Sequence, residues 1–156
     1  MPFKNNVEVK QFVFVTPENS PGMGEKIGDS ADPTIVAKIT FDCLKLGDSI
    51  CLNSIFHVTN NTTPASNVII DHSIIKNNVP MPIYAAETEI GRTTGTNIGQ
   101  IFSQQYVDVI NNLERNVTYQ VVVSVQPIMG STPDVSLLGP ITFTGTQLSE
   151  RKNGIR

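Results

Sequence analysis

The stretch that decides the fold is PTIVAKITFDCLKLGDSICLNSIFHVTNNTTPAS, residues 33–66. It contains two runs rich in β-branched and aromatic residues, 34–46 and 49–59, separated by Gly47 and Asp48. Runs of this composition are typical of β-strands, and a two-residue loop that contains glycine is typical of a β-hairpin. We therefore predict that the two runs form one hairpin.

The register of this hairpin follows from its apolar pattern. With a two-residue loop, Leu46 faces Ser49 and Cys43 faces Leu52. Because side chains alternate between the two faces of a strand, this register gathers most of the apolar residues on one face. We predict that this face lines the core, with Ile35, Ala37, Ile39, Phe41 and Cys43 from the first strand and Leu52, Ser54, Phe56 and Val58 from the second.

The same register separates the two cysteines. Cys51 falls on the opposite face from Cys43, and two thiols on opposite faces of a hairpin cannot form a disulfide without distorting it. We predict two free thiols, with Cys43 a small core residue and Cys51 partly exposed and able to cross-link subunits. The sequence has no CxxC motif and no cysteine–histidine cluster, which argues against a zinc or redox site.

Residues 98–113 allow two interpretations. Their apolar residues fit one stripe of a helix, but the segment and its continuation to 126 are rich in β-branched residues. We favour two strands, about 100–110 and 117–126, and the helix remains the alternative.

The remaining strand-like segments are 67–75, 81–90 and 137–148. About eight strands separated by turn residues predict an all-β, single-domain antiparallel β-sandwich of the jelly-roll type. We divide the chain into an N-terminal strand with a flexible linker (1–33), a β-sandwich domain (34–148) and a frayed C-terminal tail (149–156).

The composition excludes several classes of function. Lysine and arginine number 11 against 14 acidic residues, and the one basic cluster is Arg151, Lys152 and Arg156. Nucleic-acid binding by phosphate neutralisation therefore has little support. No run approaches the roughly eighteen apolar residues of a membrane span. Charged residues make up 16% of the chain, so the polar surface is built largely from Asn, Thr, Ser and Gln.

Catalytic and ligand-binding motifs find no match. His57 and His72 lie in strand-like segments without a GxSxG motif. The glycine-rich segment 21–28 lacks the GK[ST] ending of a phosphate-binding loop. Asp29 and Asp32 are interpreted as solvated loop residues rather than calcium ligands. We expect no catalytic residue, no cofactor and no metal, and hence no enzyme.

The N-terminal segment VEVKQFVFV, residues 7–15, is strongly β-prone and is followed by a seventeen-residue linker, 17–33, that contains three prolines and three glycines. Strict alternation would place four valines on one face and two phenylalanines on the other. An apolar strand left at a sheet edge invites pairing with another chain. We predict an assembly strand donated to a neighbouring subunit; the alternative is that it joins its own sheet. Its residues are Val7, Val9, Phe12, Val13, Phe14 and Val15.

Three segments carry a resemblance to known proteins. LKLGDSICLNSIF, NNLERNVTYQVVVSV and GPITFTGTQL resemble segments of tumour-necrosis-factor-like and complement-type jelly-roll heads and of their relatives on bacterial spore surfaces and spore appendage fibres. The Gly47–Asp48 turn, however, lies early in this chain and near the end of the trimeric heads. The cysteine-rich leader of some appendage subunits is also absent, which puts covalent cross-linking between subunits in doubt.

The resemblance implies a structural subunit on a cell or spore surface. Because the chain starts without a secretory-signal pattern, we expect synthesis in the cytoplasm and release by lysis. The predicted partner is the protein itself, in a homo-oligomer, filament or layer. The alternative function is a glycan- or receptor-binding module, although the sequence lacks tryptophan and has three tyrosines.

Overall fold

The computed structural model describes residues 7–16, 25–79, 81–93 and 99–150. These residues form nine strands and no helix. The strands are β1 (Val7–Val15), β2 (Glu25–Lys26), β3 (Thr34–Leu44), β4 (Ser49–Asn60), β5 (Val68–Lys76), β6 (Tyr84–Ile90), β7 (Gln100–Val109), β8 (Glu114–Val125) and β9 (Val135–Glu150).

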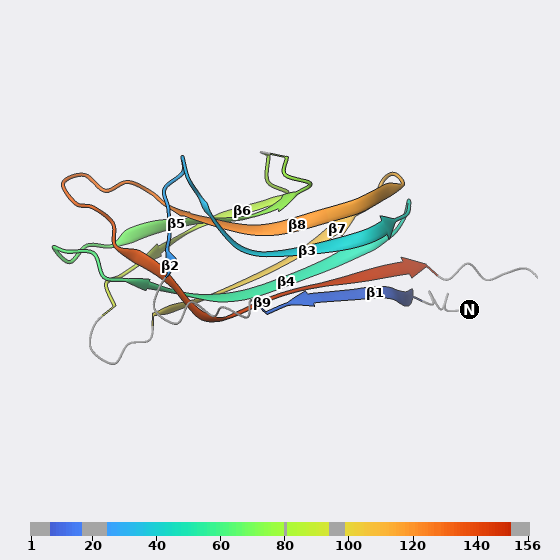
Figure 1. The fold of residues 1–156 in the computed structure, drawn as a ribbon, viewed down its shortest axis with the longest axis horizontal. Helices are drawn as coiled ribbons and strands as arrows, with labels where there is room; N and C mark the ends of the chain where they lie inside the picture. The colour runs from blue at the N-terminus through green and yellow to red at the C-terminus, as the bar shows by residue number, and fades with distance from the viewer. Residues whose placement is uncertain (1–6, 17–24, 80, 94–98, 151–156) are drawn as a thin grey trace, which may run out of the picture.

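The strands build two antiparallel sheets packed face to face (Figure 1). One sheet has the order β1-β9-β4-β7, with β2 also paired to β9, and the other has the order β3-β8-β5-β6. Consecutive strands therefore pass repeatedly from one sheet to the other. This is the arrangement of a jelly roll, which confirms the predicted fold class.

Alternation of inward and outward side chains produces the core. On β4, for example, Leu52, Ser54, Phe56 and Val58 are buried, as predicted from the sequence. Inward aromatic rings also pack between neighbouring strands of each sheet: Phe56 of β4 stacks on Phe102 of β7 at 5.1 Å, and Phe41 of β3 meets Tyr119 of β8 edge-on at 5.9 Å.

The predicted hairpin of β3 and β4 is wrong. Lys45 to Asp48 form a tight turn, in which Asp48 N–H donates to the Lys45 carbonyl at 3.0 Å. The two strands then enter different sheets, since β3 pairs with β8, whereas β4 pairs with β7 and β9. Cys43 therefore does not face Leu52. A hairpin and a turn between stacked sheets give the same alternating pattern, because the inner faces of both strands point to one core.

Two residues of β3 also depart from the predicted core face. An irregularity between Ile35 and Ala37 shifts the alternation, so Ile35 is exposed and Val36 is buried. Cys43 is half-buried rather than a core residue. Both cysteines are free, as predicted.

The region that allowed two interpretations consists of strands. β7 and β8 cover most of residues 100–125, and β8 lies at the centre of its sheet between β3 and β5. The run of β-branched residues in β8 is buried, which suits a central strand better than a helix with one exposed side.

The ends of the chain differ from the predicted domain boundaries. β2 pairs with β9, Ile27 is buried, and the Gly28 carbonyl accepts from the Val125 N–H, so residues 25–28 pack on the sandwich rather than belonging to a free linker. At the other end, Ser149 and Glu150 continue β9 instead of starting a tail. Residues 17–24 and 151–156 lie outside the described part of the chain.

Candidate assembly surface

The predicted assembly strand lies at the edge of a sheet of its own chain. β1 runs antiparallel to β9, from Val7 opposite Glu150 to Val15 opposite Phe143. Within the described residues it pairs with no other strand. Figure 1 shows β1, in blue, lying along β9, in red, at the margin of the sandwich.

A β-bulge changes which face each side chain of β1 occupies. The register shifts between Val9 and Gln11, so Lys10 is the extra residue. Because a one-residue shift exchanges the two faces, the predicted grouping of four valines is wrong. Val13 and Val15 pack against the core, whereas the outer face of β1 carries Val7, Val9, Phe12 and Phe14, all exposed.

Strand pairing continues this outer face across the whole sheet. The registers align the outward residues of β1, β9, β4 and β7 in three successive rows. We call these rows the uncharged face, because none of their side chains is charged. The rows are Val9, Leu148, Ser49 and Val109; Phe12, Thr146, Cys51 and Val107; and Phe14, Thr144, Asn53 and Gln105.

The structure therefore brings both predicted assembly features together. Cys51, the thiol predicted to face a neighbour, lies two strands from Phe12 in the same row. No local feature of the sequence signals the contribution of β7, whose Val107 and Val109 complete the rows. The interruption of the valine pattern at Gln11 is the one sequence feature that marks the bulge.

A hollow of about 560 Å³ opens on this face over β4, β7 and β9. Its lining is mostly short or polar: Cys51, Asn53, Gln105, Val107, Thr144 and Thr146, with Leu52 and Tyr106 beneath. The rings of Phe12 and Phe14 stand at its β1 side, because Phe12 pairs with Thr146 and Phe14 with Thr144. The surface therefore has a ridge beside a trough.

The outer face of the other sheet is different in chemistry. Its outward residues include charged side chains on β3, β5 and β6, together with Thr40 and Thr118, whose hydroxyls are 3.1 Å apart. We call it the charged face; its charged members are Lys38, Asp42, Asp71, Glu87 and Glu89.

A chain of hydrogen bonds crosses the interior between the two sheets. Ser54 donates to Gln104 Oε1 at 2.9 Å, the Gln104 amide donates to His72 Nδ1, and His72 Nε2 lies 3.0 Å from Thr88 Oγ1. His72 is buried, and its burial lowers the pKa of the imidazole, against the opposing charge of Asp71. These hydrogen bonds satisfy polar groups that would otherwise be buried without partners.

A second cluster closes one end of the sandwich. Lys76 Nζ lies 3.0 Å from Asp108 Oδ2 and 2.9 Å from Glu114 Oε1, and Tyr119 donates to Asp108 at 2.7 Å. Burial and the Asp108 carboxylate raise the pKa of the Tyr119 hydroxyl. Burial would lower the pKa of Lys76, but the two carboxylates outweigh it and raise that pKa. Lys76 is thus kept protonated and the Tyr119 hydroxyl neutral, as expected of a structural cluster.

A third cluster fixes the end of β9. Asp48 accepts hydrogen bonds from Gln147 at 2.6 Å, from the Lys45 N–H at 2.8 Å, and from Ser149. Burial would raise the pKa of the Asp48 carboxyl, but these hydrogen bonds together lower it. The cluster positions the strand on which β1 pairs.

Asp29, weighed in the sequence as a calcium ligand, is bonded within its own turn. Asp29 Oδ1 accepts hydrogen bonds from the N–H groups of Ala31 and Asp32 within its own turn. In the described ranges, no group of three or more His, Cys, Asp and Glu side chains could hold a metal ion. Nor does that part of the chain contain a helix of the length and hydrophobicity that a membrane span requires.

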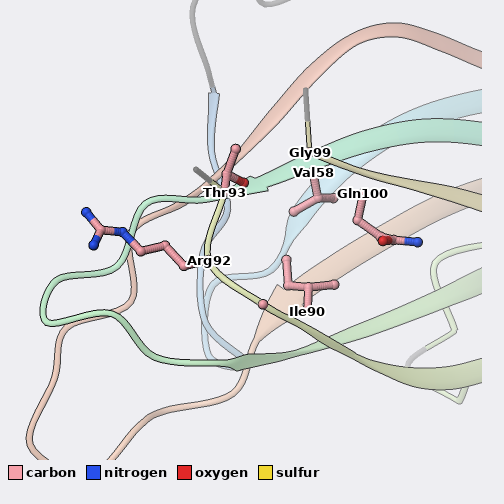
Figure 2. Close-up of a pocket in the computed structure, with 7 residues that line it drawn as sticks. Val58, Ile90, Arg92, Thr93, Gly99 and Gln100 are labelled. Carbon is pink, nitrogen blue, oxygen red and sulfur yellow. The ribbon is translucent and has the colours of Figure 1, made fainter. Parts of the chain in front are cut away.

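Figure 2 shows a smaller hollow of about 160 Å³ where the chain passes from β6 to β7. Arg92 points away from it, and Gly99 fits because an added Cβ would lie 2.4 Å from the Val58 carbonyl oxygen. Thr93 closes it by accepting a hydrogen bond from the Asn60 N–H at 3.0 Å.

Comparisons with known proteins give similarities of fold. No protein-family model matches the chain, and no curated protein matches its sequence. Among solved structures it is similar to the structure of infectious bursal disease virus Gx strain, with a TM-score of 0.46, 8% identity, and coverage of 94% of this chain and 34% of that chain. It is also similar to the VP2 subviral particle of that virus, with a TM-score of 0.42, 8% identity, and coverage of 88% and 39%. A third similar structure is Eiger TNF from S. frugiperda, with a TM-score of 0.35, 9% identity, and coverage of 93% and 90%.

The chain thus spans little more than a third of the two viral chains. Identities this low concern the fold alone, and the assignment as a jelly roll rests on the strand order and pairing described above. The resemblance to spore-surface proteins has no counterpart among these three structures.

Proposed function

We propose that the protein is a structural subunit that assembles with copies of itself into a surface fibre or layer, by donating β1 to a neighbouring copy. The observation that carries the proposal is β1 itself: an edge strand with four exposed apolar side chains on one face. Such an edge favours pairing with another chain unless something covers it.

The slot that β1 occupies can be filled in the same way by a neighbour. β1 contributes ladder hydrogen bonds to β9 and the packing of Val13 and Val15 against the core. A neighbour's β1 would make the same contacts, so exchange replaces each interaction with an equal one and costs little free energy. If every copy passes its strand onward without closing a ring, the product is a filament.

The connection from β1 to the sandwich sets the reach of the exchange. Because β2 is fixed on β9, the connecting segment runs from Val15 to Glu25 rather than to residue 33. Ten residue steps span at most about 35 Å. This is shorter than a linker to residue 33 allows, and it suffices for a neighbour in direct contact. We therefore favour closely packed subunits over widely spaced ones.

A role at a cell or spore surface, without enzymatic activity, completes the proposal. It is supported by a low content of charged residues, by a polar surface built from Thr, Asn, Ser and Gln, and by the segment resemblances noted in the sequence. The alternative, a glycan- or receptor-binding module, is favoured by one observation, the hollow of about 560 Å³ on the uncharged face.

The test compares the full chain with a form that begins at Pro17, using negative-stain electron microscopy and light scattering. We expect fibres or large particles from the full chain and monomers from the shorter form. A synthetic peptide of residues 1–16 should bind the shorter form, and a peptide of scrambled order should not. If both forms give the same small species, strand donation is wrong. If the shorter form still binds a glycan panel, the binding module is the better account.

A further inference from the structure

The ridge on the uncharged face consists of Phe12 and Phe14. Their ring centroids are 6.1 Å apart with an interplanar angle of 28°, so the rings are stacked. Their exposed fractions are 57% and 66%. Two stacked phenylalanines left in water cost hydrophobic free energy that burial against another surface would recover.

The trough lies beside this ridge on the same face. Its floor consists of short side chains, mainly Thr144, Thr146 and Cys51, and Val107 forms its far wall. Ridge and trough run in the same direction, because both follow the strands. A second copy of the chain therefore presents a ridge of the right orientation to fill this trough.

We infer that two copies pair face to face through their uncharged faces, with Phe12 and Phe14 of each copy seated in the trough of the other. A two-fold axis parallel to the strands, running between β9 and β4, produces this contact, because it places β1 of each copy over β7 of the other and overlaps all four strands. Such an axis keeps each residue at its own level along the strands. Phe12 of one copy then lies over Val107 of the other, in the row of Thr146 and Cys51, and Phe14 lies over Gln105.

Charge favours a second copy over other partners. The three rows carry no charged side chain, so two identical faces meet without repulsion between like charges. The nearest charges, Glu8, Lys10 and Glu150, lie at the rim, and Lys10 is paired with Glu8 at 2.7 Å. Two charged faces, by contrast, would bring several carboxylates together. A rim of polar groups around an uncharged centre is the usual anatomy of an interface.

The area is sufficient for a specific dimer of modest affinity. Four strands spaced by about 4.8 Å, each with about ten residues of roughly 3.3 Å, give a face of roughly 19 by 33 Å. Two such faces bury roughly 1,200 Å², which is the lower limit for specific interfaces. The pairing should therefore depend on protein concentration.

This inference rests on the proposed function in that the partner is a second copy, but it uses a different surface from strand exchange.

The first test is sedimentation of the full chain with Val107→Lys. Val79→Lys is the matched control, because Val107 and Val79 are 53% and 52% exposed and Val79 lies outside the uncharged face. We expect Val107→Lys to weaken pairing at least about tenfold, since it buries an unpaired charge, and Val79→Lys to leave pairing unchanged.

The second test detects the contact itself. With Cys43→Ser as background, a bismaleimide that spans the roughly 10 Å between packed sheets should join Cys51 of one copy to Cys51 of the other. Each chain then has a single cysteine, so the cross-link can form only between two copies. Strand exchange passes β1 between copies and does not by itself bring β4 of one copy to β4 of the other, so the cross-link reports face-to-face pairing. Adding Cys51→Ser should abolish it.

The outcomes separate the two proposals. If Val107→Lys sediments like the unchanged chain and no cross-link forms, face-to-face pairing is wrong, whatever the form beginning at Pro17 does. If the cross-link forms while that shorter form assembles like the full chain, face-to-face pairing stands and strand donation fails.

Discussion

The two outer faces of the sandwich are built on the same principle and differ in what they present. Both belong to antiparallel sheets whose inner residues line one core. The charged face carries lysine, aspartate and glutamate, as a solvated sheet does. The uncharged face carries stacked phenylalanines, valines and short polar residues. Folding alone does not require this difference, and it is the basis of the proposal that the uncharged face meets a second copy.

The largest expected effect comes from the interior, on which both faces depend. Phe143→Ala removes a fully buried ring from β9, the strand between β1 and β4. We expect a loss of about 3–5 kcal/mol in the free energy of unfolding, measured by urea denaturation. A loss below about 1 kcal/mol would mean that the two sheets are not packed as described.

The next effect concerns His72, whose hydrogen bond with Gln104 links the two sheets. Because burial holds the pKa of His72 below its ordinary value of 6.5, the unfolded chain binds more protons than the folded chain below that pH. The stabilisation is complete above about pH 6.5 and is lost as the pH falls toward the folded pKa. Protonation of Nδ1 would also oppose the donated Gln104 amide.

Urea denaturation between about pH 7.5 and 5 should therefore show stability falling with pH. In His72→Gln this slope should largely disappear. The lowered pKa of Asp48 acts at lower pH, since stability from that carboxylate is lost only as the pH falls below 3.8. An unchanged slope in His72→Gln would contradict the role given to His72.

The labelling rates of the two free cysteines allow the two faces to be compared in one sample. Cys51 lies on the uncharged face, and Cys43 lies on β3 in the other sheet; both are half-buried. Maleimide labelling followed by mass spectrometry should show Cys51 protected as protein concentration rises, by roughly tenfold where pairing is about 90% complete. Cys43 should label at a constant rate. Equal behaviour of the two thiols would argue against an interface on one face.

The smallest effect is expected on the charged face. Thr40→Ala removes the hydroxyl contact with Thr118 and should cost about 0.5 kcal/mol in the free energy of unfolding. Light scattering should show unchanged assembly. A large loss of assembly would show that the charged face is also an interface.

Much of the fold follows from alternation in the sequence. The buried face of β4 and the strands of residues 100–125 were predictable because apolar and β-branched residues mark them. The pairing partners of β4 were not predictable from the sequence. The turn at Gly47 gives the same alternating pattern whether β4 pairs with β3 or crosses to the facing sheet. Partners far apart in the chain, such as β4 and β9, leave no local signal.

The candidate surface was predictable in its parts but not in its assembly. The sequence marks β1 as an apolar, strongly β-prone segment and places Cys51 on the outward face of its strand. It does not reveal that the bulge at Lys10 turns Val7 and Val9 to the same side as Phe12, because a bulge depends on pairing with β9. Nor does it place Val107 of β7 in the same row as Cys51.

The measurement that tests the central claim most directly is whether β1 pairs with its own β9 or with that of a neighbour. Phe14 and Thr144 are directly opposed on these strands, so Phe14→Cys with Thr144→Cys places two thiols within disulfide range. In a background of Cys43→Ser and Cys51→Ser, the assembled protein is oxidised and analysed by non-reducing electrophoresis. Strand donation predicts a ladder of covalent multimers that collapses on reduction. A single monomer band with an internal disulfide would contradict it.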